Sequence, residues 1–289
     1  PSDFRQLLDA PNLHILVATY DGNIVGASLI LREGELGDEL ATQISLGERR
    51  LRGHLLPQSL LGQLGIESAG RHKYGRVMRI AVHPQWQQFG IGSELDNHTT
   101  EWARSHDLDV LGSSFGATAQ LTQFWIRQGY TPARLGFSRD SASGTHSLMV
   151  LKPINSRVVS MIDMANTQFS QAFRYDLADV HSELPSQLVV KLMVVCKDFA
   201  TLGEFERNNI GYYVRGNRPA EQVNAMIEKG IWSEPTKLSQ LASSEQQLII
   251  KRILQRHSWS NLSQNLKFTG KKATQQALRK AISSWHQLI

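Results

Sequence analysis

The 289-residue sequence has very little cysteine, since Cys196 is its only one and no disulfide can form within the chain. This usage is typical of a reducing compartment and predicts a cytoplasmic protein. No apolar run reaches the roughly 18 residues that a membrane-spanning helix needs. The first residues, Pro1 to Arg5, lack the basic segment and apolar core of a secretion signal. We therefore expect a soluble protein that is neither exported nor membrane-spanning.

A nucleotide-triphosphate loop of the form G-x-x-x-x-G-K-[ST] is also missing, because Gly270-Lys271-Lys272 has no glycine at the required upstream position. We expect no ATP binding by this segment and no metal cofactor. Internal repeats, low-complexity segments and long heptad runs are absent as well. With 41% hydrophobic and 20% charged residues, the chain has the composition of a globular protein.

Charge is distributed unevenly along the chain. Residues 1–154 carry 14 Lys+Arg and 15 Asp+Glu, a net charge of −1, whereas residues 155–289 carry 17 and 11, a net charge of +6. Glu245 is the last acidic side chain, and eight Lys or Arg residues follow it. A basic segment of this kind favours binding to a polyanion such as RNA. The alternative is a solvated helical face that contributes only to solubility.

The most informative stretch runs from Val77 to Ser93. An apolar, β-branched segment predicts a buried strand, Pro84 ends it, and Gly90 and Gly92 precede a helix. Glycines at this position let a ligand approach the backbone closely, and the amides that open a helix attract anions. The stretch therefore predicts a pyrophosphate site built from main-chain amides.

A lone Gly-x-Gly is weak evidence for a ligand site, because an ordinary connection from a strand through a turn to a helix can contain it as well. The full order of strand, Pro84, Gln87, Gly90, Gly92 and helix resembles the acyl-CoA-binding motif of the GNAT superfamily of N-acetyltransferases. The segment from Phe124 to Tyr130 resembles the second GNAT signature. Many members carry a tyrosine where this chain has Trp125, and an indole cannot protonate the departing thiolate as that tyrosine is thought to do.

The predicted elements of the first half fit this resemblance. A short helix is expected over Asp3–Ala10, and Asp21-Gly22-Asn23 predicts a hairpin between strands 13–20 and 24–31. The remaining predictions are helices at 33–48, 91–105 and 119–128 and strands at 77–83, 109–116, 133–139 and 145–151. The strand at 109–116 is expected to be parallel to that at 77–83 because a helix joins them.

Residues 155–289 have few glycine-rich turns and are expected to be mostly helical. The predicted helices are 156–176, 186–199, 219–229, 245–257 and 271–287. Ser243 with Gln246, or Ser244 with Gln247, forms a capping-box pattern, and Pro219 suits a first helical position. The fold class is α/β (α+β): a GNAT-type mixed sheet flanked by helices over residues 1–154, then a helical, basic domain over residues 155–289.

A narrower resemblance rests on several segments, which lie at residues 8–11, 52–59, 79–84, 114–116, 141–144 and 267–272. Together they look like the acetyltransferase part of bacterial tRNA(Met) cytidine acetyltransferases. The resemblance implies acetyl transfer from acetyl-CoA to the exocyclic amine of the wobble cytidine of elongator tRNA(Met). Members of that family carry a helicase-like ATPase module ahead of this part, so we expect a fragment or a reduced relative.

The resemblance also implies a set of site residues. The cofactor would contact the strand through Ile80, Ala81 and Val82, and its pyrophosphate would lie on Gln87, Gln88, Phe89, Gly90, Ile91, Gly92 and Ser93. Gln120 and Arg127 occupy positions of further cofactor contacts, although Arg127 is otherwise a surface arginine. His83 is the candidate catalytic base because its reference pKa suits proton transfer near neutrality. Its alternative role is packing beside Pro84 and Trp86.

Residues expected to contact RNA are Arg52, His54, Lys267, Lys271, Lys272, Arg279 and Lys280. The alternative for the arginines at 49–52 is surface pairing with Glu48 or Glu67. Aromatic faces for an unstacked base are Trp86, Phe89 and Trp125, of which Trp125 fits core packing better. Two other functions remain open: an acetyltransferase acting on a protein or small amine, and a non-catalytic RNA-binding module.

Overall fold

The computed structural model describes residues 12–197 and 199–289. The helix expected over Asp3–Ala10 lies outside the described residues. The chain divides into two compact units, one formed by residues 12–116 with Phe124–Gln168 and the other by Ala117–Gln123 with Phe169–Ile289. The two compact units divide inside helix α6 (Val159–Asp176), after Gln168. The expected functional boundary after residue 154 stays a prediction.

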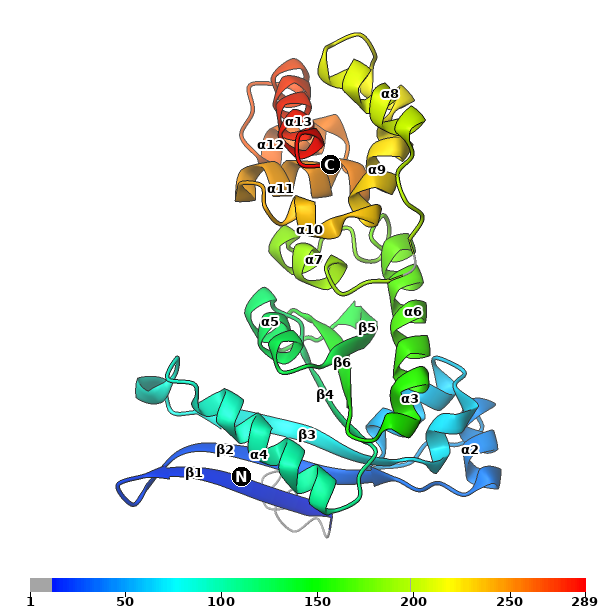
Figure 1. Cartoon of the computed structure of the whole chain (residues 1–289), viewed down its shortest axis with the longest axis vertical. Coiled ribbons are helices and arrows are strands. Elements are labelled where there is room, and N and C mark those ends of the chain that lie inside the picture. Colours follow the sequence, from blue (N-terminus) through cyan, green and yellow to red (C-terminus); the bar gives the residue numbers. More distant parts are fainter. Residues whose placement is uncertain (1–11, 198) are drawn as a thin grey trace. The chain divides into compact units, whose positions relative to one another are not determined.

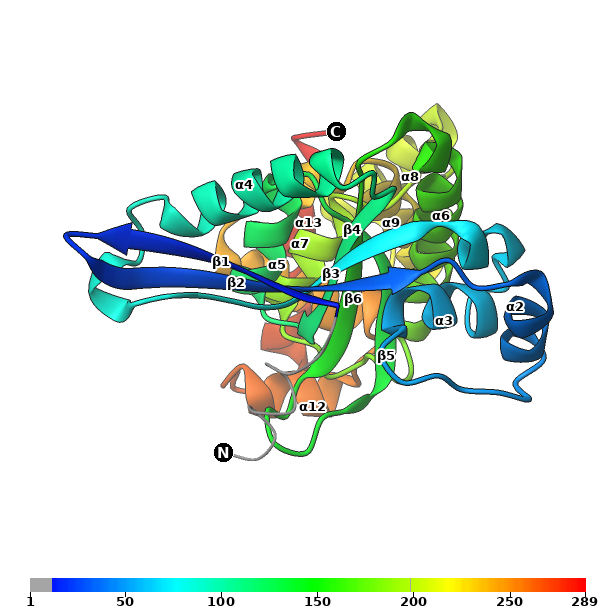
Figure 2. The ribbon, with the colours of Figure 1, turned by 90° about the horizontal axis from the view of Figure 1, so that it is seen from below.

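A six-stranded sheet forms the centre of the first unit, with the order β1-β2-β3-β4-β6-β5 (Figures 1 and 2). β3 and β4 are parallel, and the other neighbours are antiparallel. This mixed sheet with flanking helices confirms the predicted fold class. The strands are β1 Leu13–Tyr20, β2 Asn23–Gly34, β3 Lys73–Val82, β4 Val110–Gly116, β5 Thr131–Arg139 and β6 His146–Pro153.

The first hairpin has the predicted turn. Asp21 and Gly22 adopt φ angles of 47° and 73°, which is the left-handed conformation that both central residues of a tight hairpin turn require. β2 then runs on to Gly34, three residues beyond the predicted end, because Arg32, Glu33 and Gly34 continue to pair with β3.

In the described residues, four α-helices lie in the sequence between these strands: α2 Asp38–Ser45, α3 Leu55–Gly62, α4 Ile91–Ser105 and α5 Ala119–Arg127. The predicted bounds of α4 are confirmed to the residue. The prediction of a helix over 33–48 is wrong at its start, because residues 33 and 34 belong to β2 and the helix begins at Asp38. α3 was not predicted, since its sequence Leu55–Gly62 has two adjacent leucine pairs and no charged residue to mark a polar face.

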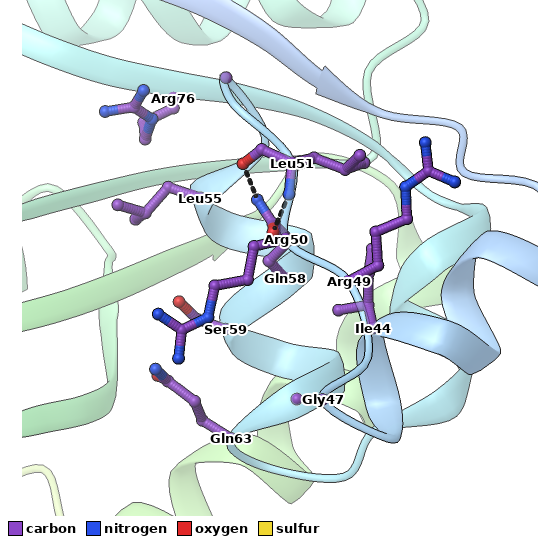
Figure 3. A pocket seen from close by; sticks show the side chains of 12 residues that line it. Ile44, Gly47, Arg49, Arg50, Leu51, Leu55, Gln58, Ser59, Gln63 and Arg76 are labelled. Carbon is purple, nitrogen blue, oxygen red and sulfur yellow. Dashed lines mark hydrogen bonds between the residues drawn. The ribbon is translucent and has the colours of Figure 1, made fainter.

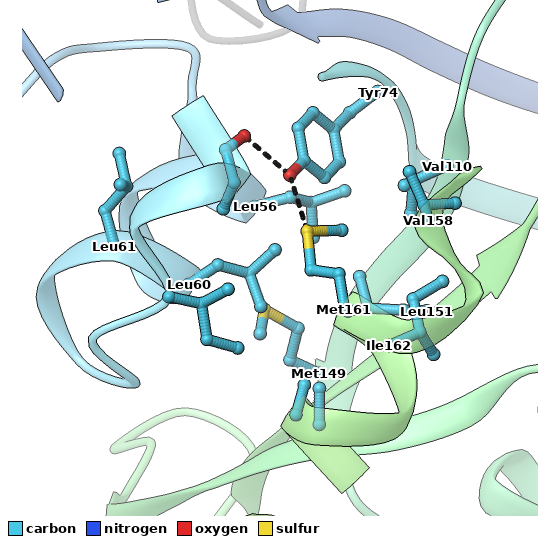
Figure 4. Packing of buried hydrophobic residues seen from close by; sticks show 14 of the residues in the cluster. Leu56, Leu60, Leu61, Tyr74, Val110, Met149, Leu151, Val158, Met161 and Ile162 are labelled. Atoms are coloured by element: carbon cyan, nitrogen blue, oxygen red, sulfur yellow. Dashed lines mark hydrogen bonds between the residues drawn. The ribbon is translucent and has the colours of Figure 1, made fainter. Parts of the chain in front are cut away.

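The core of this unit lies where α3 and the start of α6 meet the sheet (Figure 4). Leu56 and Leu60 of α3 are fully buried together with Leu151 of β6. The hydroxyl of buried Tyr74 donates a hydrogen bond to the carbonyl of Ala69 at 2.8 Å, so the one polar atom among these side chains is satisfied. Burial of this apolar surface stabilises the end of the sheet where β3 begins.

The second unit is helical, as predicted, but its elements are shorter and more numerous. Its helices are the second half of α6 Val159–Asp176, α7 Ser186–Met193, α8 Glu204–Val214, α9 Asn224–Ser233, α10 Pro235–Leu238, α11 Ser243–Ile249, α12 Trp259–Asn265 and α13 Lys271–His286. α8, α10 and α12 were not predicted. The helix expected over 245–257 begins as α11 and continues as a π-helical turn over Ile250–Leu254.

Both predicted start signals of this unit are displaced by one position. The residue before α11 is Ala242, and the carboxylate of Glu245 accepts its amide hydrogen at 3.3 Å, so neither serine pair forms the capping box. Pro219 precedes a short 3-10 turn instead of occupying a first helical position. In the described parts of the chain, no helix combines the length and apolar character needed to cross a membrane.

Candidate functional site

The two parallel strands β3 and β4 separate toward their carboxyl ends, and we call the stretch between their mutually unpaired edges the slot. β3 and β4 pair from Tyr74 and Val110 up to Val77 and Ser113, and the buried hydroxyl of Ser113 donates to the carbonyl of Val77 at 2.9 Å. Beyond this point β3 continues to Val82 and β4 to Gly116 without pairing with each other, although β3 stays paired with β2 and β4 with β6, and the ribbons diverge (Figure 1). The separation leaves two facing strand edges that an extended ligand can occupy.

The main chain of β3 presents polar groups to this slot. The amide of His83 donates to the carbonyl of Val25 at 2.8 Å, on the side of β2. Because successive strand residues point their amides to opposite edges, Ala81 faces β2 whereas Ile80 and Val82 face the slot. Consistent with this direction, the carbonyl of Val82 accepts from the side-chain amide of Gln87 at 3.1 Å.

A loop rich in free amides connects β3 to α4. Gln88 and Gly90 have φ angles of 69° and 86°, and the first hydrogen bond of α4 runs from Glu94 to the carbonyl of Gly90 at 3.0 Å. Across residues 12–197 and 199–289, no acceptor is recorded for the amide hydrogens of residues 88–93. Amides without a protein acceptor, in a loop that leads into a helix N-terminus, give a locally positive main chain that suits a phosphate group.

The two motif glycines have different structural roles. Gly90 needs its left-handed conformation, and a β-carbon placed there would meet nothing within 4 Å. Gly92 has ordinary helical geometry, and a β-carbon there would lie 3.5 Å from the ring of Phe124. Gly90 therefore determines the shape of the loop, whereas Gly92 leaves room beside α5.

Buried polar contacts tie α4 to the connection between α5 and β5. The hydroxyl of Tyr130 donates to Asp96 at 2.8 Å, and the ammonium group of Lys152 donates to the other oxygen of Asp96 at 3.1 Å. Gln128 donates to the hydroxyl of Ser93 at 2.9 Å. Burial, together with the Asp96 carboxylate, raises the pKa of Tyr130 well above its usual value. These contacts hold the N-terminal half of α4, and with it the amide loop, in one position.

Trp125 is a core residue. It is 2% exposed, its ring stacks on Phe115 with centroids 5.9 Å apart, and Tyr130 meets it edge-on at 4.7 Å. Tyr130 offers no replacement for the usual tyrosine acid, because its hydroxyl is buried and committed to Asp96. Of the other aromatic candidates, Phe89 is 74% exposed and Trp86 packs against Tyr20.

His83 is exposed at the end of β3, and its Nδ1 atom accepts the amide hydrogen of Gln85 at 3.3 Å. This contact caps the short 3-10 turn over Pro84–Trp86. An accepting Nδ1 places the proton of the neutral ring on Nε2, so the remaining nitrogen is a donor. The geometry therefore supports a capping role, and the catalytic role of His83 stays a prediction.

The two remaining cofactor candidates lie on α5. Arg127 is exposed at the end of this helix, and no ion pair of its side chain occurs in the described part of the chain. Gln120 is exposed as well, but it belongs to the second compact unit. Their contacts with the cofactor stay predictions.

The RNA candidates separate into free and committed side chains. Arg52 is exposed and, among the described residues, pairs with neither Glu48 nor Glu67. His54 instead accepts the amide hydrogen of Gly34 at 3.0 Å, which makes it a structural link to β2. In the helical unit the guanidinium of Arg279 lies over the ring of Tyr213 at 5.2 Å. The exposed lysines of this set are Lys267, Lys271, Lys272 and Lys280.

Sequence reasoning missed one group of basic side chains in the helical unit. Arg215 and Arg218 lie over the ring of Tyr212 at 4.9 and 5.1 Å. Tyr212 is 42% exposed, so an aromatic ring between two guanidinium groups reaches the surface. The spacing Tyr-x-x-Arg gives a signal only for Arg215, the residue that caps α8, because Arg218 lies in the turn after the helix and reaches the ring through the tertiary fold.

Residues 1–121 match the acetyltransferase (GNAT) family, and residues 94–155 match the family described as GNAT acetyltransferase 2. The chain is 34% identical, over 98% of its length, to the tRNA(Met) cytidine acetyltransferase TmcA of Nitrosococcus halophilus and likewise to that of Vibrio cholerae. It spans 38% of the length of each of these relatives.

Among solved structures, a GNAT family acetyltransferase from Elizabethkingia anophelis with acetyl-CoA bound is 13% identical, with a TM-score of 0.36. The alignment covers 53% of this chain and 82% of that one. The predicted resemblance to GNAT proteins and to the tRNA(Met) cytidine acetyltransferases is thus confirmed by the sequence matches. These matches support an acetyltransferase.

Proposed function

We propose that this chain transfers an acetyl group from acetyl-CoA to the exocyclic amine of a cytidine in tRNA, the wobble cytidine of elongator tRNA(Met). The observation that carries the donor half of this proposal is the slot between β3 and β4, which leads to a loop with six unsatisfied amides. Similarity to tRNA(Met) cytidine acetyltransferases over 98% of the chain supports the acceptor half.

The donor would lie along β3. The main-chain groups of Ile80 and Val82 would pair with the amides of the pantetheine arm, and the amides of residues 88–93 would hold the pyrophosphate. Gln87 would act indirectly, because its side chain is bound to the carbonyl of Val82 and shapes the loop. Arg127, exposed at the end of α5, is available for a phosphate or carbonyl oxygen of the donor.

The reaction forms a bond between the cytidine amine and the thioester carbonyl carbon and breaks the bond from that carbon to sulfur. The amine is conjugated with the ring and is a poor nucleophile, so orientation and stabilisation of the tetrahedral oxyanion must supply much of the rate. Buried Trp125 cannot protonate the departing thiolate. We therefore propose that the thiolate leaves without a tyrosine acid, and that the amine proton passes to water, or to Nδ1 of His83 after this atom is released from the amide of Gln85.

RNA would be bound in part by the basic second half of the chain, with a net charge of +6 over residues 155–289. Its exposed lysines on and before α13, and the Tyr212 ring between Arg215 and Arg218, suit phosphates and unstacked bases. Because the chain spans 38% of its relatives' length, a helicase-like ATPase module acting with it is also part of the proposal.

Mass spectrometry of tRNA nucleosides tests the whole proposal. Elongator tRNA(Met) incubated with the protein and acetyl-CoA, with and without a supplied ATPase module, is expected to gain one acetylcytidine. Omission of acetyl-CoA is the control. If no acetylated nucleoside forms in either incubation, the RNA-modifying function is refuted.

Two other functions predict different results. A protein or small-amine acetyltransferase would bind acetyl-CoA equally well, but its affinity for tRNA would show a salt slope near zero. A non-catalytic RNA-binding module would bind tRNA, but acetyl-CoA would not raise its melting temperature. The open slot and the free amides favour the catalytic proposal over this last alternative.

A further inference from the structure

A second concave site lies between α2 and α3, in the unit that contains the sheet. It has a volume of about 440 Å³, and none of the residues that line it is acidic. Its polar lining includes three arginines, Arg49, Arg50 and Arg76, together with Gln58 and Ser59 on α3 and Gln63 directly after that helix (Figure 3). We call it the Arg50 pocket.

The loop that carries Arg49 and Arg50 is held in place by one side chain. The amide of Gln58 accepts the amide hydrogen of Leu51 at 2.6 Å and donates to the carbonyl of Leu51 at 2.7 Å. The same group donates to the carbonyl of His54 at 2.8 Å. Three hydrogen bonds from one glutamine fix this loop to α3, so a ligand bound by its arginines would order little additional backbone.

Charge in the Arg50 pocket is positive and incompletely balanced. Arg76 is neutralised, because it donates to the buried carboxylate of Glu33, whose other oxygen accepts the amide hydrogen of Leu56. Arg49 and Arg50 are exposed and have no carboxylate partner in the part of the chain that the structure describes. Two guanidinium groups are therefore available to an anion.

The donors converge around Arg50. In Figure 3 its guanidinium lies on the same side of α3 as Ser59 and Gln63, whereas Arg49 extends to the other side of Ile44. Ser59 and Gln63 are one helical turn apart and therefore share a face. A guanidinium, a hydroxyl and a side-chain amide on one surface match the oxygens of a phosphodiester.

We infer that the Arg50 pocket binds a phosphodiester of the RNA acceptor, an inference that rests on the proposed function. Arg76 directly precedes Val77 on β3, where the slot begins, whereas the amide loop for the donor's pyrophosphate follows Val82 at the other end of the slot. The pocket is therefore separate from the pyrophosphate loop. In the proposed function the ligand that carries phosphodiesters is the RNA acceptor, so the pocket would contact its backbone.

Binding of fluorescently labelled elongator tRNA(Met), measured by anisotropy at several salt concentrations, tests the inference in the full chain. Arg50→Gln is expected to weaken binding about fivefold and to lower the salt slope by about 1, as loss of one phosphate contact does. Arg50→Lys keeps the charge and is expected to keep the slope. Arg71→Gln is the matched control, since Arg71 is an exposed arginine of the same unit that pairs with Asp38 at 3.1 Å.

Thermal melting of each variant confirms that it is folded. If Arg50→Gln matches Arg71→Gln in both affinity and slope, the Arg50 pocket does not contact RNA and the inference is overturned. It is overturned as well if AMP binds the wild type as tightly as tRNA does and fails to bind Arg50→Gln, because the pocket would then hold a mononucleotide. An increase in melting temperature with acetyl-CoA reports separately on the donor site, so the two proposals fail independently.

Discussion

The hydroxyl of Ser113 donates to the carbonyl of Val77 at 2.9 Å, at the last position where the two parallel strands β3 and β4 are paired. The slot begins directly after this contact. Loss of the hydroxyl in Ser113→Ala leaves a buried carbonyl without this donor, and we expect the free energy of unfolding to fall by about 1 kcal/mol. Urea denaturation measures the change.

The control for this prediction is Ser114→Ala, at the next position of β4, where the side chain is half-exposed and makes no recorded hydrogen bond. Ser114→Ala is expected to alter stability by less than about 0.5 kcal/mol. Equal stability of the two variants would show that the Ser113 contact does not hold the strands together.

The two motif glycines, Gly90 and Gly92, are predicted to differ in how well they tolerate substitution by alanine. Gly90→Ala places a side chain at φ 86° and is expected to lower stability by about 1 kcal/mol and to weaken acetyl-CoA binding, because the loop must rearrange. Gly92→Ala adds a methyl group at ordinary contact distance from Phe124 and is expected to bind acetyl-CoA nearly as the wild type does. Calorimetric titration compares them, and the reverse order would contradict the assigned role of Gly90.

His83 is tested by a pair of substitutions. Asparagine can accept the amide hydrogen of Gln85, as the imidazole does, but it does not exchange a proton near neutrality. We expect His83→Asn to keep most of the wild-type kcat and an unchanged pH–rate profile, and His83→Ala to lose stability of the loop. If the pH–rate profile of His83→Asn loses the change in rate that the wild type shows near neutral pH, His83 is instead identified as the base.

Because the pKa of Tyr130 is raised in the folded protein, we expect the free energy of unfolding to fall at alkaline pH. This pKa is raised by burial and by Asp96, so above about pH 10 the unfolded chain releases this proton while the folded chain retains it. The contribution is complete below pH 10 and is lost as the pH rises above it. Urea unfolding at pH 9 and 11 should therefore show a smaller decrease for Tyr130→Phe than for the wild type.

Tyr74 and Tyr213 also have raised pKa values because of burial, so the Tyr130→Phe variant retains part of the decrease. The difference between the two proteins isolates Tyr130. An identical decrease would mean that the Tyr130 hydroxyl is accessible to hydroxide in the folded protein.

In the helical unit, Gly230 allows close packing of two helices. A β-carbon on this residue of α9 would lie 2.6 Å from the indole of Trp285 on α13 and 3.0 Å from Leu202. Gly230→Ala is therefore expected to cost about 1–3 kcal/mol, measured by thermal unfolding. Gly37→Ala is the control because nothing lies within 4 Å of that position, and equal melting temperatures would refute the packing argument.

Much of the sheet unit could be predicted from local patterns. Asp21-Gly22 specifies the first turn through its two left-handed residues, and the length and amphipathic polarity of the segment from Ile91 to Ser105 predicted α4. The order strand, proline, glycine, helix also located the amide loop. These features depend on residues close together in the sequence, and for that reason a pattern reveals them.

Other features depend on contacts between distant residues. Glu33 continues β2 because its buried carboxylate meets Arg76 and the start of α3, 43 and 23 positions further on. At the start of α11, the carboxylate of Glu245 accepts the amide hydrogen of Ala242, and neither predicted serine pair forms the capping box. Packing of the helix against its surroundings decided at which residue it begins. Local propensity differs too little between neighbouring positions to decide such cases.

The sequence by itself predicted a main-chain pyrophosphate site, because the glycine at position 90 and the absence of a phosphate-binding lysine can be seen without reference to other segments. Only the tertiary structure decided where β3 and β4 separate. The last paired residues, Val77 and Ser113, are 36 positions apart in the sequence, so no local pattern could reveal this point. The tertiary structure also decided that His54 is a structural link while Arg50 is free. Whether a polar side chain is available depends on its partners in space, and those partners are distant in the sequence.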